Sequence, residues 1–228
     1  MIQMRAVFLT LLLTACGSAG SMQMSDSSTA SRGRESSSKL VAGDVLLVPL
    51  NCYVCNAIES ETGTPYSHSV VVANTTEDPA KRLVFEAWGE VKTTPYLEIV
   101  GRKQKNQKLF HLRAAEFVSS SAPGVRKINA VFEKNFRGLS FDDEYLWANT
   151  DEQGRDKLYC SEFVIKFMNK LMTKTLNPSP MSFTKNLPFW KQYYEQFGMV
   201  PPAGQPGGSP STLYFSDLFV KLGDVEEN

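Results

Sequence analysis

The sequence predicts an α+β domain in which an antiparallel sheet packs against helices. Two observations support this class. Short segments rich in β-branched and aromatic residues cluster early in the chain, and two longer segments with apolar residues at helical spacing follow them. The chain has 228 residues, of which 42% are hydrophobic and 21% charged, and this composition suits one globular domain.

Four segments are predicted to be strands: residues 44–50, 67–73, 82–88 and 108–113. Each is rich in residues that favour a pleated, buried surface. The first begins after Gly43 and stops near Pro49, and the turn-forming residues 74–79 join the second and third into a hairpin.

Two amphipathic helices are predicted, over residues 125–136 and 161–172. The two prolines in residues 177–180 prevent the second helix from continuing. A loop rich in Gly and Pro over residues 201–210 precedes a last short element at 213–220.

Residues 1–15 are typical of a lipoprotein signal peptide. Arg5 supplies a positive charge, and the apolar run that follows it is too short to span a bilayer. The sequence Leu-Thr-Ala-Cys that ends at Cys16 resembles a bacterial lipobox, in which Cys16 would carry several acyl chains. The alternative is an ordinary secretory signal with a chance cysteine.

A lipid anchor at Cys16 places the chain in the bacterial cell envelope. Gly17 stands where an Asp would otherwise be found, and in Gram-negative lipoproteins this resembles an outer-membrane destination facing the periplasm. Residues 16–38 are then a lipidated, Ser-rich tether that cannot bury enough apolar surface to fold. Residues 39–228 are the folded domain.

The balance of charges excludes one class of partner. The 24 Lys and Arg residues equal the 24 Asp and Glu residues, whereas a nucleic-acid binder needs surplus cations to neutralise phosphates. We therefore expect no nucleic-acid partner. The four cysteines are too few for a disulfide scaffold.

Cys160 is the first candidate for chemistry, because it stands at the start of the second amphipathic helix. A helix N-terminus offers free N–H groups and a positive dipole end, and both favour the thiolate form of cysteine. Cysteine hydrolases position their nucleophile in this way. The alternative is a small, buried core residue.

His68 and Glu86 lie on the two strands of the predicted hairpin. A turn centred on Glu77 would pair Val72 with Arg82 and His68 with Glu86, although a slip of one residue would break that contact. A carboxylate at this place could orient the imidazole, as the third member of a catalytic triad does. His68 could also be a strand-end residue without a role, and His111 is expected to have none.

Four motifs together resemble the YiiX/YebB-like cysteine hydrolases, lipoprotein members included. The motifs are residues 43–46, 67–72, 85–87 and 159–164. These hydrolases are circularly permuted papain-fold enzymes of the NlpC superfamily, and the order His, Glu, Cys seen here is the order that such a permutation requires. The resemblance spans roughly residues 42–225 and implies a permuted papain-like (NlpC-type) fold.

The resemblance also implies roles. Cys160 is the nucleophile, His68 the general base and then acid, and Glu86 the orienting residue, in a reaction that passes through an acyl-enzyme without a cofactor or metal. The N–H of Cys160 would contribute to the oxyanion hole. Some relatives place a tyrosine in the site from the C-terminal region, which makes Tyr214 a candidate; the alternative is simple packing.

Cys52 and Cys55 form a C-x-x-C motif. A zinc site needs four ligands and no second pair follows, and a thioredoxin-like motif would need a βαβ context that the sequence lacks. A disulfide, two structural thiols and a pocket-lining role all remain open.

These observations predict a membrane-anchored cysteine amidase or peptidase of the cell envelope, with peptidoglycan peptides as the expected substrate. Two alternatives stand beside it. One is a hydrolase or acyltransferase acting on lipids or acyl-amides, and the other is a lipoprotein that uses the same cleft only for binding.

Overall fold

The computed structural model describes residues 39–120 and 122–226. The predicted signal peptide, the lipidation site Cys16 and the Ser-rich tether lie outside these residues. Within the described ranges, no helix is both long enough and apolar enough to cross a membrane.

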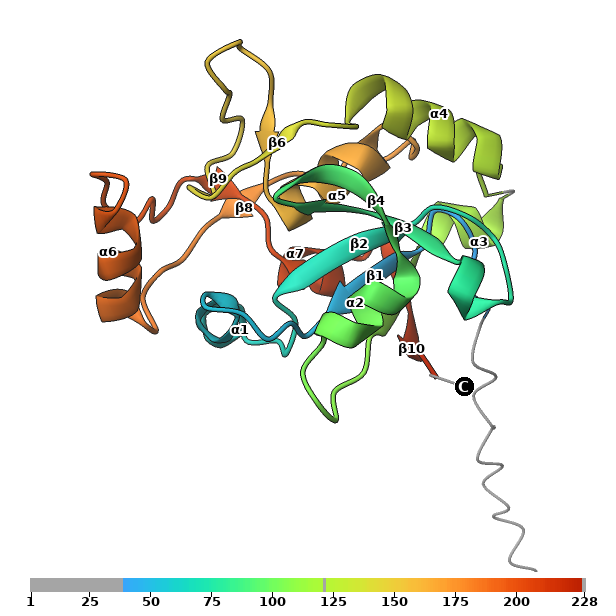
Figure 1. The fold of residues 1–228 in the computed structure, drawn as a ribbon, viewed down its shortest axis with the longest axis horizontal. Coiled ribbons are helices and arrows are strands. Elements are labelled where there is room, and N and C mark those ends of the chain that lie inside the picture. The colour runs from blue at the N-terminus through green and yellow to red at the C-terminus, as the bar shows by residue number, and fades with distance from the viewer. Residues whose placement is uncertain (1–38, 121, 227–228) are drawn as a thin grey trace, which may run out of the picture. The chain divides into compact units, whose positions relative to one another are not determined.

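An eight-stranded sheet in the order β10-β5-β1-β2-β3-β4-β6-β7 forms the centre of the domain (Figure 1). Its strands are β1 Val45–Val48, β2 His68–Val72, β3 Leu83–Trp88, β4 Glu90–Pro95, β5 Phe110–Ala114, β6 Ser140–Phe141, β7 Lys157–Leu158 and β10 Phe219–Asp224. The described neighbours pair antiparallel, except that β6 and β7 are parallel. A separate ribbon joins β8 Ser179–Pro180 to β9 Pro206–Gly207.

Helices cover both faces of this sheet. They are α1 Cys55–Thr62, α2 Tyr96–Arg102, α3 Ala115–Ser119, α4 Val125–Asn135, α5 Cys160–Asn169, α6 Leu187–Glu195 and α7 Pro210–Phe215, with a short 3₁₀ helix, η1, at Pro79–Lys81. The fold is therefore mixed α+β, as the sequence predicts.

Alternating residues of the central strands belong to two separate hydrophobic cores, because successive side chains of a strand point to opposite faces of the sheet. On one face, Phe85 of β3 stacks on Phe132 of α4 with ring centroids 3.8 Å apart, and α5 adds Phe167. On the other face, Val84 packs near Ile99 of α2. Both faces are thus buried, which explains the near-continuous apolar character of the inner strands.

The predicted hairpin is present, but its register differs from the expected one. Val72 pairs with Val84 instead of Arg82. The connection between the strands is not a symmetric turn, because η1 occupies part of it and the Asp78 side chain accepts a hydrogen bond from Ala80 N–H. The register is therefore shifted by two residues. A shift by two residues leaves every side chain of the two strands on the face of the sheet that the predicted register gives it.

The last predicted element is also different in detail. The sequence predicts one short element at 213–220, whereas the chain forms α7 and then β10, which pairs with β5 at the edge of the sheet.

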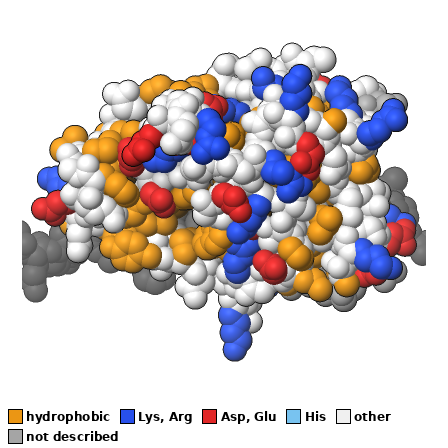
Figure 2. All heavy atoms as spheres, turned by 45° about the horizontal axis from the view of Figure 1, so that its top comes forward, with side chains coloured by type: hydrophobic (Ala, Val, Ile, Leu, Met, Phe, Trp, Pro, Cys, Tyr) orange, Lys and Arg blue, Asp and Glu red, His pale blue; other side chains and the backbone are white. Residues whose placement is uncertain are grey.

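On the face shown in Figure 2, Lys and Arg side chains are interspersed with Asp and Glu, in agreement with the equal numbers of both charges in the sequence.

Candidate active site

Cys160 is the first residue of α5 and is only 6% exposed. Two hydrogen bonds hold the chain around it: Ser161 Oγ donates to the Gly208 carbonyl at 3.0 Å, and Gly208 N–H donates to the Tyr159 hydroxyl at 2.8 Å. The Cys160 sulfur lies 3.9 Å from the Ser67 carbonyl oxygen. The thiol is thus placed at a helix N-terminus and against the start of β2.

His68 is the first residue of β2 and is buried. Its Nε2 lies 3.0 Å from Oε2 of Glu86, and its ring meets the Trp88 indole edge-on at 5.7 Å. Burial alone would lower the pKa of His68. Charge and hydrogen-bond interactions with Cys160, together with those of Glu86, outweigh burial and raise the pKa to about 9.

Glu86 is fully buried on β3, and both of its carboxylate oxygens are engaged. Besides His68, it accepts hydrogen bonds from Thr94 Oγ1 and from Arg102, each at 2.6 Å. Burial alone would raise the pKa of Glu86, but these partners lower it to about 2. The Arg102 guanidinium also lies over the Trp88 ring, 4.9 Å from its centroid.

The structure therefore brings together the three residues that the sequence singles out. Cys160 and His68 line the same cavity, the Cys160 sulfur lies against the Ser67 carbonyl next to His68, and His68 contacts Glu86 on β3. Because Glu86 holds Nε2, the second ring nitrogen of His68 is left for the sulfur. This is the arrangement of a nucleophile, a proton carrier and an orienting carboxylate.

Thr94 and Arg102 complete the site and are not apparent from the sequence. A buried carboxylate needs a hydrogen-bonded cation, so Glu86 itself signals that one is present. The sequence offers 24 Lys and Arg residues without indicating which one folds over β3.

Two cavities meet at Cys160. One has a volume of about 210 Å³ and the other about 520 Å³, and both are lined by Ile58, Ser67, Tyr145 and Cys160. The smaller one continues along Tyr159, Ser161 and the β9–α7 connection. The larger one continues along His68, Trp88 and the N-terminal end of α1. A substrate can therefore extend from the nucleophile in two directions.

Tyr145 lines both cavities at Cys160, whereas Tyr214 lines neither of them. Burial first, then Tyr193 and Cys160, raise the pKa of Tyr145 well above its ordinary value, so its hydroxyl keeps its proton. Tyr214 packs instead against Phe110, at a ring distance of 5.2 Å, under the Lys221 ammonium. Tyr214 is thus placed as in the alternative that the sequence leaves open, simple packing, because α7 turns it toward the β5 side.

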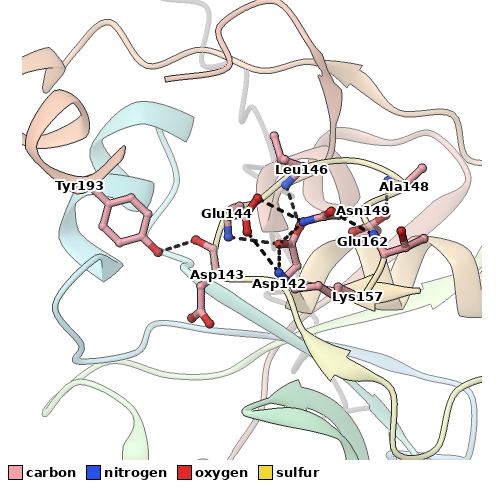
Figure 3. Close-up of polar contacts among 10 residues, drawn as sticks. Asp142, Asp143, Glu144, Leu146, Ala148, Asn149, Lys157, Glu162 and Tyr193 are labelled. Atoms are coloured by element: carbon pink, nitrogen blue, oxygen red, sulfur yellow. Dashed lines mark hydrogen bonds and ion pairs between the residues drawn. The ribbon is translucent and has the colours of Figure 1, made fainter. Parts of the chain in front are cut away.

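The loop after β6 holds Tyr145 in a sparsely populated backbone conformation, with φ of 51°. The buried Asp142 carboxylate accepts hydrogen bonds from Leu146 N–H and the Asn149 amide at 2.8 and 2.9 Å, and Glu162 of α5 accepts one from Ala148 N–H at 3.0 Å (Figure 3). These contacts offset the strain and fix the loop relative to α5. No sequence pattern we considered points to this loop.

Cys52 and Cys55 form a disulfide at the start of α1, and both line the larger cavity. Of the readings that the sequence leaves open, the disulfide and the pocket-lining role therefore hold together. His111 lies on β5, where its Nε2 is 2.8 Å from the Asp44 carboxylate, within the sheet core.

Comparison with known proteins adds information on the fold. No family model matches the sequence, and no curated protein matches it. The structure is similar to the crystal structure of the metalloprotein YiiX from Escherichia coli O157:H7, with a TM-score of 0.64 and 21% sequence identity over 82% of this chain and 98% of that chain. At this identity the similarity shows a shared fold.

The donor groups of the described residues do not fit a metal site. In the described part of the chain, no group of three or more His, Cys, Asp and Glu side chains is placed to hold a metal ion. At Cys160, Nε2 of His68 and both oxygens of Glu86 are already engaged by protein groups. We therefore derive no step through a metal.

Proposed function

We propose that this chain is a cysteine hydrolase of a permuted papain-like, NlpC-type fold that cleaves an amide bond through an acyl-enzyme. One observation carries the proposal: Cys160 at a helix N-terminus lines the same cavity as His68, His68 contacts Glu86, and two cavities meet at Cys160.

The reaction follows from this geometry. The Cys160 sulfur, as thiolate, attacks the amide carbonyl carbon and forms a thioester, while the C–N bond breaks and the His68 imidazolium gives its proton to the leaving nitrogen. Neutral His68 then removes a proton from water, which attacks the thioester and releases a carboxylic acid and the thiolate. Glu86 keeps the imidazole in place throughout.

Two donors are placed to stabilise the oxyanion. The N–H of Cys160 belongs to the first turn of α5, where backbone N–H groups have no acceptor within the helix. Tyr145 lines both cavities, and its raised pKa keeps its hydroxyl protonated. We propose that it is the second donor.

The lipobox at Cys16 supports a location in the cell envelope, anchored to the outer membrane and facing the periplasm. Peptidoglycan peptides and acyl-amides are the substrates within reach of an anchored domain there. We propose hydrolysis of one of these over a role limited to binding, because the buried pair of His68 and Glu86 lies at the cavity that also contains the Cys160 thiol.

Thiol labelling combined with product profiling tests the proposal. Wild-type protein should react with iodoacetamide at neutral pH at Cys160, the free cysteine of the described residues, and Cys160→Ala should abolish this labelling. Cells producing the two forms should differ in muropeptide stems or in acyl-amide species. If labelling is absent at neutral pH and both profiles are unchanged, the chain is not a cysteine hydrolase.

A further inference from the structure

The two cavities at Cys160 have different relations to the proposed reaction, and this inference rests on that proposal. His68 lines the larger cavity, whereas the smaller one is lined by Tyr159 and Ser161 at the N-terminus of α5. The leaving nitrogen must lie where His68 can protonate it. The amine half of the substrate therefore occupies the larger cavity, and the acyl half occupies the smaller one.

Apart from the His68 imidazolium beside the nucleophile, the charge that lines the larger cavity is negative. Among the described residues that line it, Asp143 is the single carboxylate, and there is no Lys or Arg. No described side chain donates a hydrogen bond to the Asp143 carboxylate, which points away from the contacts of Asp142, Glu144 and Lys157 (Figure 3). Asp143 is an exposed residue at this wall, and its partial desolvation, together with the charges of Asp142 and Glu144, raises its pKa against the opposing effect of Lys157. A cation nearby would relieve this cost.

Aromatic rings face the same space. Tyr145, Tyr193 and Phe197 line the larger cavity, as does Trp88, whose ring already lies under the Arg102 guanidinium. The negative faces of such rings attract cations, most strongly when water is excluded. The Tyr193 hydroxyl also donates a 2.6 Å hydrogen bond to the Asp143 carbonyl and so keeps this residue at the wall.

The smaller cavity offers no free charge. Its Glu61 carboxylate accepts hydrogen bonds from Ser182 Oγ and from the backbone N–H groups of Thr184 and Lys185. Side chains such as Phe183 and Trp190 contribute an apolar surface. This cavity suits an uncharged, apolar acyl group.

We infer that the substrate is an amide between an apolar acyl group and an amine that carries a further positive charge, bound by Asp143 and the aromatic wall of the larger cavity. A free carboxylate at the same position of the amine half is repelled. The charge of the amine half thus discriminates among substrates: amines with a second ammonium group fit, and amines that end in a carboxylate do not.

Three matched amides test the inference. Each carries a hexanoyl group, joined to putrescine, pentylamine or γ-aminobutyrate, so that the amine halves have similar length and differ in charge. We expect kcat/KM to be at least about tenfold higher for the putrescine amide than for the pentylamine amide, and lowest for the γ-aminobutyrate amide. Asp143→Asn should remove most of the preference for putrescine, so that the ratio of the putrescine to the pentylamine kcat/KM falls toward one. Glu152→Gln, which removes an exposed carboxylate that lines neither cavity, should change nothing.

The possible failures are distinguishable. If hydrolysis depends on Cys160 but the three rates are equal, or if Asp143→Asn leaves their ratio unchanged, the charge selectivity is wrong and the hydrolase proposal stands. If no amide is hydrolysed, calorimetric binding of the three intact amides to wild type and Asp143→Asn decides the selectivity alone. Equal affinities for the putrescine, pentylamine and γ-aminobutyrate amides would overturn it.

Discussion

His68 lies between a sulfur and a carboxylate, and its pKa of about 9 makes the imidazole a cation at neutral pH. If this cation protonates the leaving amine, kcat/KM should fall above about pH 9. Glu86→Gln removes the charge that helps to keep the proton on His68. The alkaline limb of the kcat/KM profile should then move to lower pH by about one unit or more. The value of kcat should fall by about a hundredfold. Glu98→Gln, at an exposed site on α2, is the control. Identical pH profiles in wild type and Glu86→Gln would contradict an orienting role.

Arg102 acts on the reaction only through Glu86, so it is a positioning residue. Arg102→Met should leave one Glu86 oxygen short of a buried partner, which costs about 1–3 kcal/mol of stability. The pKa of Glu86 should rise, and the acid limb of the activity profile should move to higher pH. Arg102→Lys restores the charge and should recover part of the activity and of the acid limb. A loss of stability without any shift of the acid limb would mean that Arg102 serves only the fold.

At the scale of elements, the β9–α7 connection supports the nucleophile from the side of the smaller cavity. A Cβ at Gly208 would overlap Cδ1 of Ile165, which is fully buried on α5, whereas a Cβ at Gly207 would meet only the flexible end of Met181. Gly208→Ala should therefore destabilise the domain by about 1–3 kcal/mol. It should also displace the Gly208 N–H and carbonyl groups, which bond Tyr159 and Ser161. Urea unfolding and kcat/KM should both respond to Gly208→Ala and barely to Gly207→Ala. An equal effect of both substitutions would contradict this account.

The elements that the sequence predicts best are those with a strong apolar period. The helix predicted over residues 125–136 is found as α4, and β1 lies within the predicted 44–50. Helices α1, α2 and α6 and strand β4 have no counterpart in the sequence-based prediction. Their side chains become buried only through distant partners, as when Ala57 of α1 packs with Trp190 of α6.

The sequence could predict which residue types react and on which face of the sheet their side chains lie. The contact of His68 with Glu86 survives a wrong register because a shift of two residues keeps both side chains on one face. Arg102 and Tyr145 were not predictable, because both reach the site through long-range packing of an α-helix and a loop. A motif indicates which residue types react, and the tertiary contacts determine which residues support them.

For the whole molecule, buried carboxylates determine how stability depends on pH. Asp44, before β1, contacts His111 at 2.8 Å and Arg113 at 2.7 Å on β5, and Glu86 links β3 to Arg102 at 2.6 Å. Burial would raise both pKa values, but these partners lower that of Asp44 below its ordinary value and that of Glu86 to about 2. Each carboxylate therefore binds its proton less readily in the folded than in the unfolded chain.

A carboxylate with a depressed pKa stabilises the fold fully above its unfolded pKa and loses that contribution as the pH falls through its folded pKa. The free energy of unfolding should thus decrease as the pH falls from about 5 to about 2.

His68 acts in the opposite direction: its raised pKa stabilises the fold below about pH 6.5, and this contribution is lost as the pH rises through about 9. Urea unfolding across this range should show a maximum between these limits. Asp44→Asn should flatten only the acid side, and His68→Gln only the alkaline side, whereas stability that rises continuously toward pH 9 would contradict the assignment of the imidazole as a buried cation.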